Sequence, residues 1–188
     1  MERRELLMAL AHERTYTTDD IYALPDGQRA ELIDGRMYMM APPRTIHQKI
    51  SSVLHVAIYQ YIKSKKGICE VFAAPFAVFL NKDNHNYVEP DISVICDKDK
   101  LDDRGCNGAP DWIIEIISPS DPQRDYDVKL FKYRTAGVRE YWIVNPSTHA
   151  VTVYDFEKKV GTNQYTFNDD IPVNIYGDLK INIAALLS

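Results

Sequence analysis

The fold of this chain is set by residues 110–117, whose sequence reads PDWIIEII. Five of these eight positions carry Trp or Ile, the bulky and β-branched side chains that favour a buried strand. Side chains alternate between the two faces of a strand, so Ile113, Glu115 and Ile117 share one face and the residues between them share the other. The sequence therefore predicts a carboxylate inside an otherwise apolar sheet core.

Further apolar stretches complete a sheet around this strand. They span residues 69–80, 88–96, 140–144 and 150–154. A hairpin is predicted over residues 31–39, because Asp34-Gly35 tolerates the positive φ angles of a tight turn. Residues 97–109 are rich in charge and contain two glycines, so we expect an exposed loop there.

Helical periodicity marks three segments of the chain. Residues 45–66 repeat apolar side chains at intervals of three and four, which is typical of a helix with one buried face. Residues 122–136 follow a capping Ser120 and begin with proline, and Gly137 suits the left-handed residue past a helix end. Residues 2–11 form a short amphipathic segment that packs either on this domain or on a partner.

The composition is that of an ordinary globular protein, with 188 residues, 45% hydrophobic and 26% charged. We expect a single domain over residues 1–188, of α/β class with an α+β mixed sheet, and a helical lead-in over residues 1–25. No apolar run approaches the roughly 18 residues needed to cross a bilayer, and the acidic and basic start is unlike a signal peptide. These features predict a cytoplasmic protein without a membrane partner.

The three cysteines, Cys69, Cys96 and Cys106, are odd in number and show no CxxC spacing. This pattern argues against a disulfide framework and against a zinc site. We therefore expect reduced cysteines with structural roles.

A buried Glu115 needs compensation, because an unpaired carboxylate in an apolar core costs several kcal/mol. Asp91 stands at the start of the predicted strand 88–96, just after Pro90. If the two strands are neighbours, the two carboxylates converge and form the oxygen-rich site that Mg²⁺ prefers, with positions left for water and a phosphate oxygen. Hydrolysis of a phosphodiester is the chemistry that such a site favours.

Lys129 lies on the predicted helix 122–136, one step from its apolar face, where its amine can reach the carboxylates. There it would orient the attacking water and offset the charge that grows on the phosphoryl group. Other interpretations remain open. Lys129 can pair with Asp125 at the surface, Asp91 can be a turn residue at the strand entry, and Glu115 can pair with a buried arginine.

At this point the chain resembles the PD-(D/E)xK nuclease superfamily and, within it, the Uma-type family that is grouped with restriction endonucleases. The resemblance covers nearly the whole chain. The segments that carry it are residues 31–35, 40–43 with His47, Glu89-Pro90-Asp91, 110–120, Asp125 with Lys129 and Tyr133, and 137–144.

The resemblance implies a restriction-endonuclease-like core flanked by helices, Mg²⁺ or Mn²⁺ as cofactor, and Asp91 and Glu115 as the acidic pair of the motif. The lysine that the superfamily places two residues after the second acid is Ile117 here, and family members point to Lys129 in its place. Glu31 matches an additional acid near the metal, and His47 matches a family position at the start of the long helix. Glu31 can also simply close a hairpin, and His47 can cap a helix.

The proline-aspartate pair also occurs at Pro110-Asp111. Asp111 and Glu115 on one extended strand would lie about 13 Å apart, too far to share one ion. Asp91 therefore remains the predicted ligand.

Two functions follow from this pattern. The first is a Mg²⁺-dependent endonuclease that hydrolyses DNA, and the second is an inactive nucleic-acid-binding or interaction module on a nuclease scaffold. A net charge of −5 gives no general attraction to a polyanion, so DNA contact requires a local basic patch. The candidates for this patch, which can also be ordinary solvated residues, are Lys63, Lys65, Lys66, Arg124, Lys132, Arg134 and Arg139. A homodimer is expected, because two sites related by a two-fold axis match the two strands of a duplex.

Overall fold

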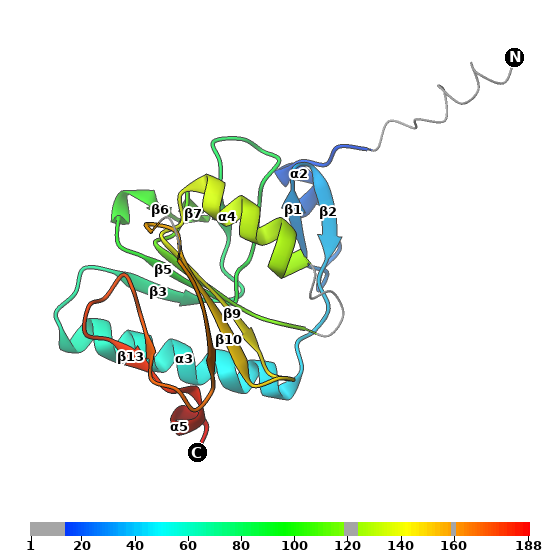
Figure 1. Cartoon of the computed structure of the whole chain (residues 1–188). Helices are drawn as coiled ribbons and strands as arrows, with labels where there is room; N and C mark the ends of the chain where they lie inside the picture. Colours follow the sequence, from blue (N-terminus) through cyan, green and yellow to red (C-terminus); the bar gives the residue numbers. More distant parts are fainter. Residues whose placement is uncertain (1–13, 119–123, 159–160) are drawn as a thin grey trace, which may run out of the picture.

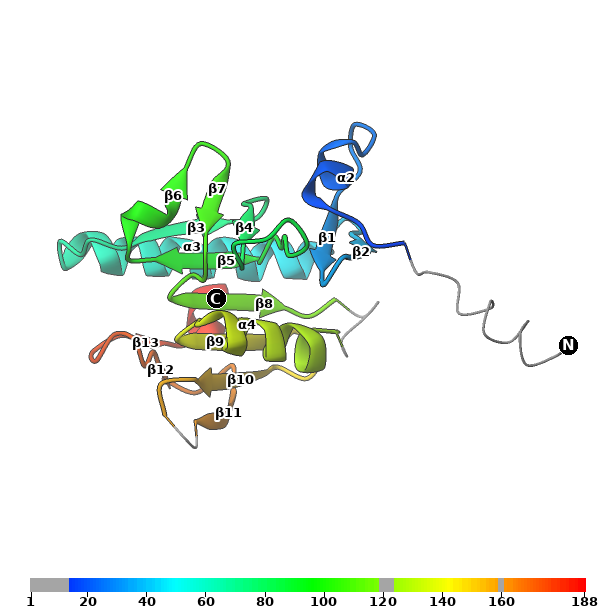
Figure 2. The same ribbon diagram turned by 90° about the horizontal axis from the view of Figure 1, so that it is seen from above.

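The computed structural model describes residues 14–118, 124–158 and 161–188 (Figure 1). A six-stranded sheet forms its centre, with the strand order β11-β10-β9-β8-β5-β3. The strands are β3 (Glu70–Ala73), β5 (Ile92–Ile95), β8 (Trp112–Ile116), β9 (Glu140–Asn145), β10 (Ala150–Asp155) and β11 (Thr162–Thr166). β8 and β9 run parallel, and the other neighbours are antiparallel, so the predicted mixed sheet is confirmed (Figure 2).

Helices flank this sheet on both sides, as predicted. On one side, α3 (Thr45–Ser64) packs against the face of β8 that carries Trp112 and Ile114. On the other side, α4 (Leu130–Ala136) packs against the face of Ile113, where Tyr133 is fully buried. Figure 1 shows the sheet between these two helices. The alternation predicted for residues 110–117 therefore holds, and it turns Glu115 toward the side of α4.

The predicted hairpin of residues 31–39 consists of β1 (Ala30–Ile33) and β2 (Arg36–Met39). Its turn has φ angles of 50° at Asp34 and 74° at Gly35, the left-handed values that Asp-Gly was expected to supply. The short helix α2 (Thr18–Tyr22) precedes it. In Figure 2 the hairpin stands beyond the end of the sheet toward which β8 points.

Two predictions about the chain before β8 need correction. The stretch 69–80 does not lie wholly in the central sheet, because the chain leaves it after β3, passes the cis Ala74-Pro75 bond and continues as β4 (Val78–Phe79) in another sheet. The expected exposed loop 97–109 instead contains η1 (Lys98–Lys100), β6 (Leu101–Asp102) and β7 (Gly105–Asn107). Cys106 is buried there because β7 pairs with β4.

The predicted helix 122–136 has two parts in the described residues. Arg124–Lys129 form a π-helix, η2, which leads directly into α4. Gly137 ends α4 with a φ of 98°, as predicted. The expected capping residue Ser120 and the start at residue 122 lie outside the described residues, as does the amphipathic segment 2–11.

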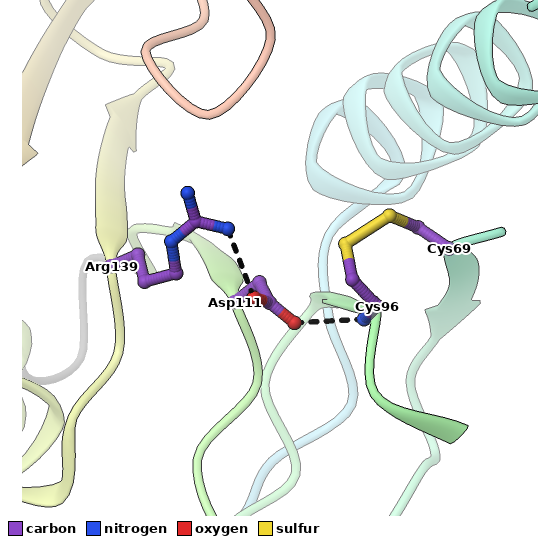
Figure 3. The surroundings of a disulfide bond; sticks show 4 residues. All are labelled: Cys69, Cys96, Asp111 and Arg139. Carbon is purple, nitrogen blue, oxygen red and sulfur yellow. Dashed lines mark hydrogen bonds and ion pairs between the residues drawn. A yellow bond between two sulfur atoms is a disulfide. The ribbon is translucent and has the colours of Figure 1, made fainter. Parts of the chain in front are cut away.

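The expectation of reduced cysteines is wrong for two of the three. Cys69 and Cys96 form a disulfide (Figure 3). The register of β3 and β5 pairs Glu70 with Ile95, so the residues one step outward lie opposite each other. Cys106 is free and buried.

The C-terminal part contributes β12 (Ile171–Pro172), β13 (Lys180–Ile181) and α5 (Ile183–Leu187). Their apolar side chains join the core on the α3 side of the sheet. Among the described residues, no helix combines the length and the apolar character required to span a bilayer.

Candidate active site

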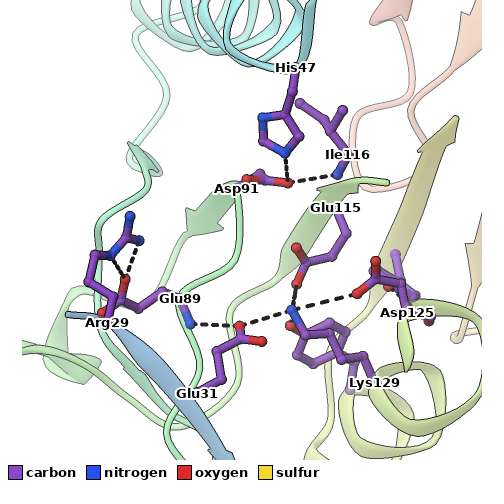
Figure 4. A network of polar contacts seen from close by, with 11 residues as sticks. Arg29, Glu31, His47, Glu89, Asp91, Glu115, Ile116, Asp125 and Lys129 are labelled. Carbon is purple, nitrogen blue, oxygen red and sulfur yellow. Dashed lines mark hydrogen bonds and ion pairs between the residues drawn. The ribbon is translucent and has the colours of Figure 1, made fainter. Parts of the chain in front are cut away.

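Lys129 lies at the centre of a cluster of acids between the sheet and the β1–β2 hairpin (Figure 4). Its Nζ is 2.8 Å from Oε1 of Glu115, 2.9 Å from Oε1 of Glu31 and 3.7 Å from Oδ1 of Asp125. The lysine is 3% exposed, and the three acids are buried as well. One ammonium group thus contacts three carboxyl groups, and its single positive charge cannot neutralise all three when they are ionised.

Three separate elements bring these side chains together. Glu115 comes from β8 at the centre of the sheet, and Glu31 comes from β1 of the hairpin. Asp125 and Lys129 both come from the π-helix η2, whose inner side they occupy. A π-helix is rare and is frequently found at functional sites, which agrees with its place here.

Asp91 is held beside this cluster at the entrance to β5. Its Oδ2 accepts a hydrogen bond of 2.7 Å from the backbone N–H of Ile116 and lies 3.1 Å from Nε2 of His47. β5 and β8 are neighbours in the sheet, the condition under which Asp91 and Glu115 were expected to converge. His47 reaches the site from the first turn of α3.

Two further contacts fix the orientation of the glutamates. Tyr133 donates a hydrogen bond of 2.6 Å to Oε1 of Glu115, the same oxygen that accepts from Lys129. The backbone N–H of Glu89 donates to Oε1 of Glu31 over 3.1 Å. The other oxygen of Glu31, Oε2, is buried without a hydrogen-bond partner among the described residues.

The electrostatics reflect this crowding of acids. Burial raises the pKa of Glu115 to about 8, and the attraction of Lys129 opposes the shift only in part. Burial likewise raises the pKa of Asp125. For Glu31, the charge of Lys129 and its hydrogen bond outweigh burial, so the pKa is lowered. The surrounding acids raise the pKa of Lys129, so it remains protonated.

All of these acids face one cleft with a volume of about 490 Å³. The residues that line it include Glu31, Asp91, Glu115, Asp125, Lys129 and His47 from the cluster. The rest of the wall comes largely from β2 and the segment after it, which contribute residues 37–41 and Pro43. A ligand in this cleft can therefore reach the carboxylates and the lysine together.

Comparison with known proteins gives a family and a similar fold for this chain. The family model Uma2, described as "Putative restriction endonuclease", matches residues 18–183. The chain belongs to the Uma2 family. A similar solved structure is that of a "putative nuclease belonging to DUF820" from Anabaena variabilis ATCC 29413. It is 24% identical, with a TM-score of 0.73, and the match covers 91% of this chain and 97% of that one. No curated protein matches.

The sites predicted from sequence are thus brought together in this Uma2 chain. Asp91, Glu115, Lys129, Glu31 and His47 all line the same cleft. The idea that Lys129 forms only a surface ion pair is wrong, because the lysine is buried and also contacts two glutamates. The buried partner of Glu115 is this lysine, where an arginine was the alternative.

The predicted DNA-contact residues are scattered. Of the seven, Arg124 alone lines the cleft among the described residues. Lys63, Lys65 and Lys66 lie at the far end of α3 from His47, about 24 Å away at roughly 1.5 Å per residue. The other three are engaged locally: Lys132 pairs with Asp34, Arg134 lies over the ring of Phe156, and Arg139 pairs with Asp111 and Glu157.

Asp111 is confirmed to lie away from this cluster. Its Oδ2 accepts from the backbone N–H of Cys96 over 2.7 Å, and Arg139 holds its other oxygen at 3.2 Å (Figure 3). In the second proline-aspartate pair, Asp111 therefore has a structural role near the disulfide.

Sequence reasoning gave no role to several residues of the site. Tyr133 was noted only as part of the family pattern, and Arg29 and Tyr87 were not noted. Arg29 lines the cleft and binds Glu89, whose other oxygen accepts from Tyr87 over 2.6 Å. A signal was available, because Arg29 lies at the entry to β1, two residues before Glu31, and side chains two apart in an extended chain point to the same side.

The residues of the cleft suit a divalent cation. Four acidic side chains, those of Glu31, Asp91, Glu115 and Asp125, lie around one lysine, so the cluster offers more carboxyl oxygens than its single ammonium group can bind. Glu31 also directs an unpartnered buried oxygen into this region. Among the described residues no three His, Cys, Asp or Glu side chains are grouped closely enough to hold an ion by themselves. Water and a phosphate oxygen would complete the shell of an ion held by two carboxylates.

Proposed function

We propose that this Uma2 protein is a metal-dependent endonuclease that hydrolyses phosphodiester bonds of DNA. The observation that carries the proposal is the buried contact between Lys129 and Glu115 at the base of a cleft that also holds Asp91. Burying a lysine among acids costs free energy of desolvation, so such a group is weak evidence for stability. Buried charged groups of this kind are common at catalytic sites.

In this proposal Asp91 and Glu115 would hold Mg²⁺ or Mn²⁺. A divalent ion there would supply Lewis acidity toward the phosphate and a lowered pKa for a bound water. The remaining steps belong to the chain. Lys129 orients the attacking water and offsets the charge that develops on the phosphoryl oxygens. The attacking water loses a proton to solvent as its oxygen bonds to phosphorus, the bond from phosphorus to the leaving oxygen breaks, and a proton from solvent passes to that oxygen.

His47 acts through Asp91 in this scheme. Its Nε2 contacts Oδ2 of Asp91, the oxygen that the Ile116 N–H also binds, so the carboxylate is held from two directions. The hydrogen bond with Asp91 raises the pKa of His47 against the opposing effect of burial. His47 therefore orients the Asp91 carboxylate, as the hydrogen-bond partners of metal-binding residues do.

A plasmid-nicking assay tests the proposal, with Mg²⁺, Mn²⁺ or EDTA, on wild type, Lys129→Met and the control Lys132→Met. Lys132 lies three residues further along the helical segment and pairs with Asp34 at the surface. We expect nicking by wild type and Lys132→Met in either metal, none in EDTA, and a loss of at least about 100-fold in Lys129→Met. Equal nicking by Lys129→Met and wild type would remove the lysine from the mechanism.

Calorimetry separates this enzyme from an inactive module on the same scaffold. The nuclease should bind Mn²⁺, and binding should weaken in Asp91→Asn and Glu115→Gln. A chain that binds DNA without binding metal or cutting would be the inactive module. Light scattering tests the homodimer that two-strand cleavage suggests.

A further inference from the structure

One face of the β1–β2 hairpin forms a wall of the cleft beside the acids. The register pairs Glu31 with Tyr38, and the backbone N–H of Met40 donates to the carbonyl of Arg29 over 2.8 Å. Cross-strand partners share a face of a hairpin, so these four side chains leave it on the same side. All four line the cleft. An apolar surface made by Tyr38 and Met40 therefore adjoins the catalytic acids.

Arg29 is held rigidly at the edge of this surface. Its Nε donates to Oε2 of Glu89 over 2.8 Å, and its Nη2 contacts the same oxygen. Glu89 is buried and is itself fixed by the hydroxyl of Tyr87. The Arg29 side chain is still 38% exposed, and its Nη1 donates to no acceptor within the described part of the chain. A phosphate oxygen in the cleft can take that place.

The charges around the cleft do not suit a long duplex. Among the described residues that line it, the permanent cations are Arg29, Arg124 and Lys129, and Lys129 is engaged by acids. Proteins that grip duplex DNA through its backbone neutralise roughly 6–10 phosphates. Single strands are bound differently, because bases that stack on aromatic side chains contribute alongside the phosphate contacts.

The depth of Lys129 points the same way. The lysine is 3% exposed at the base of the cleft, so the scissile phosphate must enter to reach it. A phosphate of a base-paired strand lies on the surface of a wide double helix, which is too broad to enter the cleft. An unpaired nucleotide can enter a cleft of about 490 Å³ by itself. This volume falls within the roughly 300–1,000 Å³ of clefts that hold small ligands.

We propose that Arg29, Tyr38 and Met40 form a subsite for one unpaired nucleotide next to the scissile bond, which makes single-stranded or locally unpaired DNA the substrate. Arg29 takes the phosphate, and Tyr38 and Met40 take the base. The guanidinium of Arg124, 5.4 Å from the Tyr38 ring centroid, stiffens this surface from one side. The proposal rests on the nuclease function above.

Binding in Ca²⁺ tests the subsite without requiring cleavage. The probes are a fluorescein-labelled oligothymidylate and a hairpin duplex of equal length, measured by anisotropy. Wild type should bind the single strand at least about tenfold more tightly than the duplex. Met40→Ala and Arg29→Gln should each lose about tenfold in affinity for the single strand.

Matched controls exclude general effects on the surface or on stability. Phe131→Ala removes a side chain that is 64% exposed and outside the cleft, and Arg104→Gln removes an arginine that pairs with Asp102. Both controls should bind like wild type. Thermal melts verify the fold of each variant, and if Arg29→Gln melts early, Met40→Ala carries the test by itself.

The outcomes distinguish the subsite from the nuclease function. Equal binding of both probes, no binding of either, or unchanged binding by both cleft variants overturns the subsite, even where plasmid DNA is nicked. Preferential single-strand binding that the cleft variants abolish, without cleavage in Mg²⁺ or Mn²⁺, supports the subsite and overturns the nuclease function. Cleavage of an oligonucleotide at an unpaired position, with the flanking duplex intact, supports both.

Discussion

Lys129 and Glu115 form an ion pair of 2.8 Å inside the protein, with side chains 4% and 6% exposed. The lysine comes from a helix, although the superfamily pattern expects it on the strand of Glu115 itself, at the position of Ile117. Ile117 is buried in the apolar cluster on the same side of the sheet. The lysine thus approaches the same strand face from outside the sheet.

Substitution of Lys129 should reveal how much the acids depend on it. Lys129→Met leaves Glu31 and Glu115 buried without their cation, and the loss of one partner from a buried pair costs about 3 kcal/mol. We expect the free energy of unfolding in EDTA to fall by about this amount in urea titrations. Added Mn²⁺ should restore part of the loss, because the ion replaces the missing positive charge. A variant as stable as wild type would show that the acids take up protons instead.

Asp91 should matter for metal binding more than for folding. In Asp91→Asn the amide oxygen can still accept from the Ile116 N–H, so the chain should fold. The substitution removes the negative charge that a divalent ion needs. Loss of a residue that only orients a ligand costs about 10–100-fold in metal affinity, so we expect the Mn²⁺ affinity to fall by at least this much in calorimetry and nicking to fall with it. Unchanged Mn²⁺ affinity would exclude Asp91 as a ligand.

The raised pKa of Glu115 predicts how stability depends on pH. Its value rises from an ordinary 4.5 to about 8 in the folded protein, so the folded state binds this proton more tightly than the unfolded state. Its contribution to stability is complete below about pH 4.5 and is lost as the pH rises through about 8. In EDTA the free energy of unfolding should therefore fall from about pH 5 to pH 8.

The comparison with Glu115→Gln isolates this effect, because glutamine does not titrate. The variant should lose less stability than wild type over the same pH range in urea titrations. Parallel pH profiles for the two proteins would mean that Glu115 is ionised throughout. Mg²⁺ binding should also release a proton near neutral pH, which calorimetry in buffers of different ionisation enthalpy detects.

The parts of the site that the sequence predicted are those with a local signal. Alternation along β8 placed Glu115 on its face, Asp34-Gly35 predicted the hairpin that carries Glu31, and the periodicity of α3 located its start near His47. The meeting of Asp91 with Glu115 depended on the pairing of β5 with β8, which the sequence left as a condition. The family resemblance then favoured Lys129.

The parts that could not be predicted depend on distant pairing. Glu31 and Lys129 are 98 residues apart in sequence and meet only in the folded chain. The strand β7 was missed because one of its two partners, β4, lies before β5, and because the charged residues of its hairpin with β6 resemble an exposed loop. The disulfide was missed because its two cysteines become neighbours only through the register of β3 and β5. No periodicity distinguishes the π-helix η2 from an α-helix.

Tyr133 should act as a positioning residue for Glu115. Tyr133→Phe removes the hydroxyl that donates to Glu115 Oε1 and leaves the ring in its T-shaped contact with Tyr141, so the fold should persist. A hydrogen bond to a charged group contributes about 1.5–3 kcal/mol. We expect weaker Mn²⁺ binding and a lower kcat with an unchanged KM for DNA. A change in KM alone would place Tyr133 in substrate binding instead.

The disulfide offers a test far from the acids. Cys69 and Cys96 are separated by 27 residues, and the segment between them includes Asp91. In the chain-entropy description, closing a loop of this length stabilises the folded state by about 3.5 kcal/mol, so Cys96→Ser should lower Tm markedly. Thiol titration of the unreduced, denatured wild type should find one free thiol, that of Cys106, and three after reduction. Three thiols before reduction would contradict the disulfide. In that case Cys96→Ser removes no bond, and the variant should melt at the same temperature as wild type.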